Sequence, residues 1–145
     1  MKGDMYSSMT VKPYSRKVNY YETDQMGIIH HSNYIRWFEE ARVDFLEQID
    51  FGYDKVAERG IDFAVLDVYC EYKSMVRFGE TVNIHVSLLD LKLASIALNY
   101  QIFDAVTGEL RTLGKTRHCF YDGKKHCPVS LKKTIPELYE LFCTL

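Results

Sequence analysis

The stretch NYYETDQMGIIHHSNYIRWFEEARVDFL, residues 19–46, decides the fold because it begins like a strand and ends like a helix. Between the two patterns stand one acid, one glycine and two histidines: Asp24, Gly27, His30 and His31. Neither a strand nor a helix requires these residue types at this point. The loop is therefore the first place to look for chemistry.

The second half of this stretch has the periodicity of a long helix. Ser32 and Asn33 are both good N-caps, and the apolar residues that follow them recur every three or four positions. This spacing predicts one buried, aromatic-rich stripe, and FGYDKVAERG, residues 51–60, predicts a second short helix closed by Gly60. The apolar stripe consists of Tyr34, Trp37, Phe38, Ala41, Phe45, Leu46 and Ile49.

The rest of the chain alternates between apolar and polar residues, which is the pattern of strands with one wet face. The parity shifts at Val65-Leu66, which predicts a bulge. TIPELYELF predicts a last helix with a capping box from Thr134 to Glu137 and Pro136 near its start. The predicted strands are VNYY at residues 18–21 and the ranges 61–72, 82–88, 96–102 and 110–121.

This order of elements predicts an α+β protein, with one antiparallel sheet that curls around the long helix. The 145 residues suit a single domain, 1–145, of which residues 1–10 are expected to form a loose tail. A formal charge of -2 gives no general attraction to nucleic acid, and no apolar run approaches the length of a membrane span. We therefore expect a cytoplasmic protein whose four cysteines, without a CxxC pair, are reduced.

Two segments resemble the hot-dog-fold acyl-CoA thioesterases, in particular the 4-hydroxybenzoyl-CoA thioesterase and YbgC-like branch. The first is YYETDQMGIIHHSNYIRWFEEAR, which is similar to the branch's pattern of an acid, a glycine, an apolar pair and Asn-Tyr opening an aromatic helix. The second is YCEYKSMVRFGETVNIHV, and together they extend the resemblance over residues 14 to about 122. The resemblance implies a single five-stranded sheet wrapped around a central helix.

The resemblance also gives the loop residues chemical roles. Taken alone, Asp24 reads as a turn aspartate, whereas the family implies that it is the general base or the nucleophile of thioester hydrolysis. The backbone N–H of His31, at the helix N-terminus, matches the family's oxyanion donor. Gly27 is expected to let the backbone approach the substrate closely. No metal and no cofactor other than the coenzyme A of the substrate is implied.

Residues of the loop and of the start of the long helix are expected to bind the substrate, together with residues that come later in the chain. The acyl group is expected to be short- or medium-chain or aromatic and to lie between the subunits. Its carrier is expected to be either coenzyme A or acyl carrier protein. A homodimer is expected at minimum, with a homotetramer as the alternative. The expected substrate-binding residues are Gly27, Ile28, Tyr34, Phe63, Arg77 and Lys92, where Lys92 is the basic residue of the turn LDLKLAS.

The other histidines and the cysteines are expected to have structural roles. His30 is assigned a structural role because consecutive side chains point in different directions. His118-Cys119 and His126-Cys127 lack the spacing of a zinc site, and His118 is expected to be a core histidine. Two other functions remain alternatives: a hot-dog acyl-thioester hydratase or dehydratase, and a non-catalytic acyl-CoA sensor.

Overall fold

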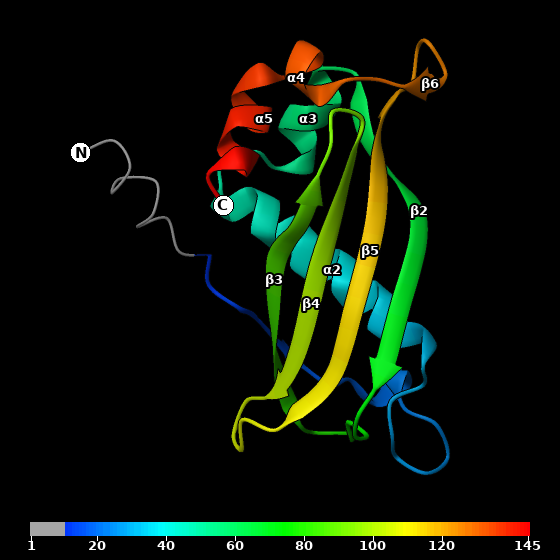
Figure 1. The fold of residues 1–145 in the computed structure, drawn as a ribbon. Helices are drawn as coiled ribbons and strands as arrows, with labels where there is room; N and C mark the ends of the chain where they lie inside the picture. The colour runs from blue at the N-terminus through cyan, green and yellow to red at the C-terminus, as the bar shows by residue number, and fades with distance from the viewer. Residues whose placement is uncertain (1–10) are drawn as a thin grey trace, which may run out of the picture.

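The computed structural model describes residues 11–145, so the predicted tail at residues 1–10 lies outside them. One long helix crosses the inner face of a curled sheet, and short helices gather at one end of it (Figure 1). This arrangement confirms the predicted α+β architecture. The elements are β1 Tyr14–Lys17, the 3-10 helix η1 Tyr20–Glu22, α2 Ser32–Gln48, α3 Tyr53–Glu58, β2 Ile61–Tyr72, β3 Thr81–Leu91, β4 Ser95–Asp104, β5 Leu110–Asp122, β6 Cys127–Pro128, α4 Leu131–Thr134 and α5 Pro136–Cys143.

The sheet is antiparallel, with strand order β1-β3-β4-β5-β2, and the two-residue β6 adds to β5 outside this path. The four long strands β2 to β5 are strands of the predicted sheet. In β2 the register shifts between Val65 and Asp67, which leaves Leu66 without a partner and confirms the predicted bulge. β2 is an edge strand, and the side chains of Val65, Leu66, Tyr69 and Tyr72 on it are about half exposed.

Helix α2 buries its aromatic stripe against the sheet, as its spacing predicts. Trp37 and Phe38 are fully buried, at 0% exposure. On β5, Gly114 faces the Phe38 ring so closely that an added Cβ would lie 2.2 Å from Phe38 Cζ. A glycine is therefore required where the helix approaches the sheet backbone. None of the helices among residues 11–145 is long and apolar enough to cross a membrane.

The first predicted strand, residues 18–21, is wrong in its position. β1 ends at Lys17, four residues in register with β3, and the chain then turns into η1. The reason is local, because the N–H of Asn19 donates to the Glu22 carboxylate at 2.8 Å and this bond favours a tight turn. Tyr20 and Tyr21 are left 78% and 77% exposed rather than alternating in a sheet.

The predicted capping box at the last helix is also wrong. The Thr134 hydroxyl donates to the Ser130 carbonyl at 2.9 Å, so Thr134 ends α4 instead of capping α5. The Glu137 carboxylate pairs instead with Arg59, the residue that follows α3. Pro136 does occupy the first turn of α5, where its missing N–H is tolerated, as predicted.

Candidate active site

The loop around Asp24 is a tight hairpin that closes on itself. Asp24 N–H donates to the Ile28 carbonyl at 2.9 Å, and Gly27 N–H donates to the Asp24 carbonyl at 3.0 Å. Gly27 has a φ of 74°, which explains the glycine, whereas an added Cβ there would meet nothing within 4 Å. The structure thus gives a conformational reason for Gly27, and its close approach to substrate stays a prediction.

The carboxylate of Asp24 is exposed, and only one of its two oxygens accepts a hydrogen bond from the described residues. Its Oδ1 accepts the N–H of Met26 at 2.8 Å, which is the contact expected of a turn aspartate. Its Oδ2 makes no hydrogen bond within residues 11–145. The side chain can therefore hold the turn with one oxygen while it presents the other to solvent.

A second loop lies along this hairpin and brings two of the predicted residues together. Phe78 N–H donates to the Gly27 carbonyl at 3.0 Å, and Ile29 N–H donates to the Val76 carbonyl at 2.9 Å. Ile28 and Arg77 form the bridge between these bonds. Ile28 and Arg77 are thus neighbours of the Asp24 hairpin, as a shared site requires.

The two histidines follow the hairpin. The prediction that their side chains point in different directions is wrong. Their rings stack with centroids 4.3 Å apart, because His31 already has helical φ and ψ. His30 Nδ1 bonds to Ser32 Oγ at 2.9 Å, which is consistent with a structural role for His30. The N–H of His31 has no acceptor in the part of the chain that the structure describes, and it precedes the first residue of α2. It is therefore free to donate to a bound group.

A buried carboxylate that the sequence reasoning missed holds the base of the hairpin. Glu22 is 2% exposed, and we call it and its three partners the Glu22 clamp. Its main-chain carbonyl accepts the N–H of His30 at 2.9 Å, which fixes the return strand of the hairpin. The side-chain oxygens accept four hydrogen bonds, two from Arg16 at 2.8 and 2.9 Å, one from Trp37 Nε1 at 2.8 Å and one from Asn19 N–H at 2.8 Å.

Asn33 ties the clamp to the start of α2. Ser32 or Asn33 was predicted as the N-cap, but α2 begins at Ser32, and its N-cap residue His31 makes no capping hydrogen bond with its side chain. Asn33 is instead buried, and its Nδ2 donates to the Glu22 carbonyl at 2.9 Å. The signal in the sequence was the placement of Glu22 two residues before the candidate acid, inside an aromatic segment.

The neighbouring loop has an ionic anchor of its own. Arg111 Nη2 donates to Glu80 Oε2 at 3.0 Å and to Asp104 Oδ2 at 2.9 Å. The other carboxylate oxygen of Glu80 accepts the N–H of Arg77 at 2.6 Å. The loop that supports the Asp24 hairpin is therefore fixed to the sheet through a largely buried arginine.

Of the three remaining predicted residues, Tyr34 lies in the first turn of α2, and the other two lie at the far end of the sheet. Tyr34 is 4% exposed and packs on Tyr72 in the core, with ring centroids 4.9 Å apart. Phe63 lies at the opposite end of β2, nine residues before Tyr72, or roughly 30 Å along the strand. Lys92 lies in the β3–β4 turn, which is at the same end of the sheet as Phe63. A single chain does not bring Phe63 or Lys92 to Asp24.

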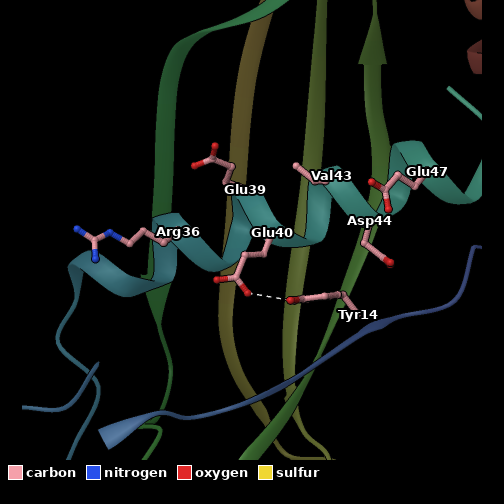
Figure 2. A pocket seen from close by; sticks show the side chains of 7 residues that line it. All are labelled: Tyr14, Arg36, Glu39, Glu40, Val43, Asp44 and Glu47. Atoms are coloured by element: carbon pink, nitrogen blue, oxygen red, sulfur yellow. Dashed lines mark hydrogen bonds between the residues drawn. The ribbon is translucent and has the colours of Figure 1, made fainter. Parts of the chain in front are cut away.

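The outer face of α2 carries a hollow of about 580 Å³ that is separate from this loop. Figure 2 shows that all of its side chains except Tyr14 project from the helix, and that the hydroxyl of Tyr14, on β1, donates to Glu40 at 2.9 Å. Four carboxylates and one arginine line it, a charge balance that repels phosphate groups. The lining residues are Tyr14, Arg36, Glu39, Glu40, Val43, Asp44 and Glu47.

His118 is buried in the core, as expected, but only one of its two ring nitrogens makes a hydrogen bond among the described residues. Its Nε2 bonds to Thr116 Oγ1 at 2.8 Å, while Nδ1 has no partner among the described residues. Burial, together with the positive charge of Arg42, lowers the pKa of His118 to about 4. Within residues 11–145 no group of three or more His, Cys, Asp or Glu side chains is arranged to hold a metal ion.

Comparison with known proteins agrees with this architecture. Residues 18–140 match the model of the Thioesterase-like superfamily. The chain is 36% identical to a protein of Aquifex aeolicus provisionally named an esterase, over 86% of this chain and 94% of that protein. It is 29% identical to a Bacillus subtilis protein provisionally named acyl-CoA thioesterase YneP, over 87% of this chain and 91% of the other.

A solved structure gives the same result in three dimensions. The DHNA-CoA thioesterase of Staphylococcus aureus superposes with a TM-score of 0.86 at 30% identity, covering 91% of this chain and 88% of that one. The family match extends over most of the chain and includes both the hairpin and helix α2. The chain therefore belongs to the Thioesterase-like superfamily and is a thioester hydrolase with the hot-dog fold.

Proposed function

We propose that this protein hydrolyses acyl-CoA thioesters that carry an aromatic or a short- to medium-chain acyl group. The names of two relatives support the coenzyme A part, since one is provisionally an acyl-CoA thioesterase and the other a DHNA-CoA thioesterase. The exposed loop suits a bulky carrier, because the thioester can reach Asp24 without entering the core. The observation that carries the proposal is the exposed Asp24 carboxylate in a hairpin that leads into a His31 N–H without an acceptor among the described residues.

In this proposal the two groups divide the chemistry. Attack on the thioester carbonyl puts negative charge on its oxygen, and the His31 N–H at the start of α2 stabilises that charge with the aid of the helix dipole. Asp24 either takes the proton of the attacking water or attacks the carbonyl itself and forms a mixed anhydride that water then cleaves. In both routes the coenzyme A thiol leaves and the free acid is released.

We further propose that the functional unit is a dimer formed through β2. This strand is a long edge with half-exposed apolar side chains, which a second copy can cover. A twofold axis pairs it antiparallel with itself, so that Phe63 of the partner subunit approaches the end of β2 that lies near the Asp24 hairpin. Light scattering at micromolar concentration is expected to give twice the chain mass or more, and a stable, active monomer would contradict it.

The test of Asp24 is its replacement by asparagine. In Asp24→Asn the side-chain oxygen can still accept the Met26 N–H, so we expect little change in stability. Loss of the carboxylate should lower kcat by roughly 10²- to 10⁴-fold with KM for acyl-CoA nearly unchanged. Steady-state hydrolysis with detection of the released thiol, alongside thermal melting, measures both quantities.

The matched control is Asp122→Asn. Asp122 also holds an exposed turn, through the N–H groups of Lys124 and Lys125 at 2.8 and 3.0 Å, but it lies far along the sheet in the β5–β6 turn. This variant should keep its full turnover number. An Asp24→Asn protein with near-normal kcat would defeat the assignment of Asp24.

A further inference from the structure

The position of Asp24 depends on the contacts that hold its hairpin, because residues 24–26 at the tip of the hairpin are exposed. Two main-chain hydrogen bonds, at 2.9 and 3.0 Å, join the hairpin to the loop between β2 and β3. We call this segment, which consists of residues 73–80, the support loop. Any contact that fixes the support loop therefore also restricts where the hairpin can lie.

Arg111, on β5, binds the support loop at both of its ends. At the start of the loop, the main-chain carbonyl of Arg111 accepts the N–H groups of Lys73 and Ser74 at 2.9 and 3.1 Å. Its Nη1 donates to the Ser74 hydroxyl at 3.3 Å and to the Met75 carbonyl at 3.2 Å. At the end of the loop, its Nη2 donates to Glu80 Oε2 at 3.0 Å. One residue thus connects the two ends of the loop.

Glu80 links this arginine to the segment that touches the hairpin. Its Oε1 accepts the N–H of Arg77 at 2.6 Å, and Arg77 forms the bridge with Ile28 of the hairpin. The two oxygens of one carboxylate therefore hold the guanidinium and the bridging residue at the same time. The side chains of Glu80 and Arg111 are 28% and 13% exposed, so their ion pair is largely shielded from water, which strengthens it.

The surroundings of Arg111 differ from those of Arg42, in the middle of α2. Arg42 is 6% exposed, and its guanidinium donates to the neutral hydroxyls of Tyr53 and Tyr100. Arg111 instead faces three carboxylates, which come from the support loop, the end of β4 and the β4–β5 turn. They belong to Glu80, Asp104 and Glu109 and lie 3.0, 2.9 and 3.3 Å away. Arg111 is therefore a junction of three segments, of which the support loop contacts the hairpin.

We propose that Arg111 and Glu80 are positioning residues of the hydrolysis, which hold the Asp24 carboxylate in its reactive geometry through the support loop. The inference rests on the proposed role of Asp24. Misplacing a reacting group by about 1 Å can cost roughly 10²-fold in rate, so a side chain that does not touch the substrate can control turnover. The largely buried Arg111 acts in this way through its ion pair with Glu80.

The test compares two carboxylates that accept from the same nitrogen of Arg111. In Glu80→Gln the amide oxygen can still accept the Arg77 N–H, while the amide nitrogen faces Arg111 and breaks the ion pair. In Asp104→Asn the amide oxygen can still accept two N–H groups of the β4–β5 turn, and the ion pair with Arg111 is broken in the same way. Both variants should lose stability, but only Glu80→Gln should lower kcat, by roughly 10-fold.

Two measurements separate a positioning role from a merely structural one. Steady-state kinetics below the melting temperature should show a lower kcat with nearly unchanged KM in Glu80→Gln, and values within about twofold of the wild type in Asp104→Asn. Hydrogen exchange should be faster at the amides of Ile29 and Phe78, which bond the hairpin to the support loop, in Glu80→Gln alone. Equal kcat values or equal exchange rates in the two variants would overturn the proposal.

A second pair of variants tests the arginine itself. Arg111→Lys keeps the charge but loses the planar fork that reaches both ends of the support loop, so kcat should fall by roughly 10-fold again. Arg117→Lys is the control, because Arg117 lies on the same strand in an exposed ion pair with Asp67, and it should keep its turnover number. A normal kcat in folded Arg111→Lys would contradict the proposal. If this variant fails to fold, the pair of carboxylate variants still decides.

Failure of this inference can be told from failure of the proposed function. A wild-type protein that hydrolyses acyl-CoA, with equal kcat in the Glu80→Gln and Asp104→Asn variants, keeps the proposed function and removes the positioning role. A wild-type protein that does not hydrolyse acyl-CoA overturns both.

Discussion

Glu22 and Arg42 are both buried charges, yet the protein surrounds them very differently. Glu22 accepts four hydrogen bonds at its carboxylate, two of them from a guanidinium. Arg42 meets two neutral hydroxyls and a cavity. A charge whose bonding capacity is filled from within the fold serves to fix shape, whereas a charge that is left partly open can serve recognition.

Of the substitutions that test this comparison, Glu22→Gln is expected to lower the free energy of unfolding the most. Glu22→Gln keeps an acceptor for Trp37 but removes the negative charge that Arg16 faces. Breaking a buried ion pair from one side costs about 4 kcal/mol of unfolding free energy. Urea unfolding followed by circular dichroism measures this loss, and kcat should fall as well, because the clamp fixes the hairpin that carries Asp24.

The control for this change is Glu40→Gln, on the other side of the same arginine. Glu40 also pairs with Arg16, at 2.8 Å, but its side chain is 35% exposed, so the same chemical change should cost less than about 1 kcal/mol. Equal losses in the two variants would show that the Glu22 clamp is no more structural than a surface pair. The contrast with Arg42 would then fail.

The second prediction concerns how stability depends on pH through His118, whose pKa is lowered by burial and by the charge of Arg42. Folded His118 stays neutral down to about pH 4, whereas unfolded His118 takes up a proton near its ordinary pKa of 6.5. Between these values the unfolded state binds more protons, so stability should fall as the pH drops from 6.5 to 4 and level off below. The loss attributable to His118 is at most about 3 kcal/mol, from 2.5 pH units at 1.36 kcal/mol each.

Stability curves of His118→Gln measure this contribution. The variant should lose the His118 component of the decline between pH 6.5 and 4, and His85→Gln, a change at an exposed histidine of β3, should keep it. A wild-type curve that runs parallel to that of His118→Gln would mean that the core tolerates a second cation. Arg42 would then have a compensating partner after all.

The sequence predicted the layers of the fold because they depend on periodicity, which a single chain carries in full. The aromatic stripe of α2, the alternation of β3 and β4 and the bulge at Leu66 all follow from the spacing of apolar residues. The Asp24 loop was found through the irregularity between two periodic segments and through its likeness to a family. Ile28 and Arg77 do lie beside it.

The errors come from contacts that local patterns do not contain. Residues 18–21 alternate like a strand, but the carboxylate of Glu22 captures Arg16 and Trp37 and turns the chain. Phe63 lies near the start of β2, whereas the Asp24 hairpin lies near its other end. Only the register of the sheet reveals this separation. The absence of an acidic partner for Arg42 among residues 11–145 is likewise a property of three-dimensional neighbours.

Trp37 is the only tryptophan of the chain, and its indole nitrogen bonds to the carboxylate of the Glu22 clamp. It is fully buried, so its fluorescence arises from one defined environment. If the clamp opens, water reaches the indole and the emission moves to longer wavelength, because the excited state is stabilised by mobile dipoles. The protein thus carries an intrinsic optical probe of the base of its Asp24 hairpin, and rapid-mixing fluorescence can follow that loop during turnover without any label.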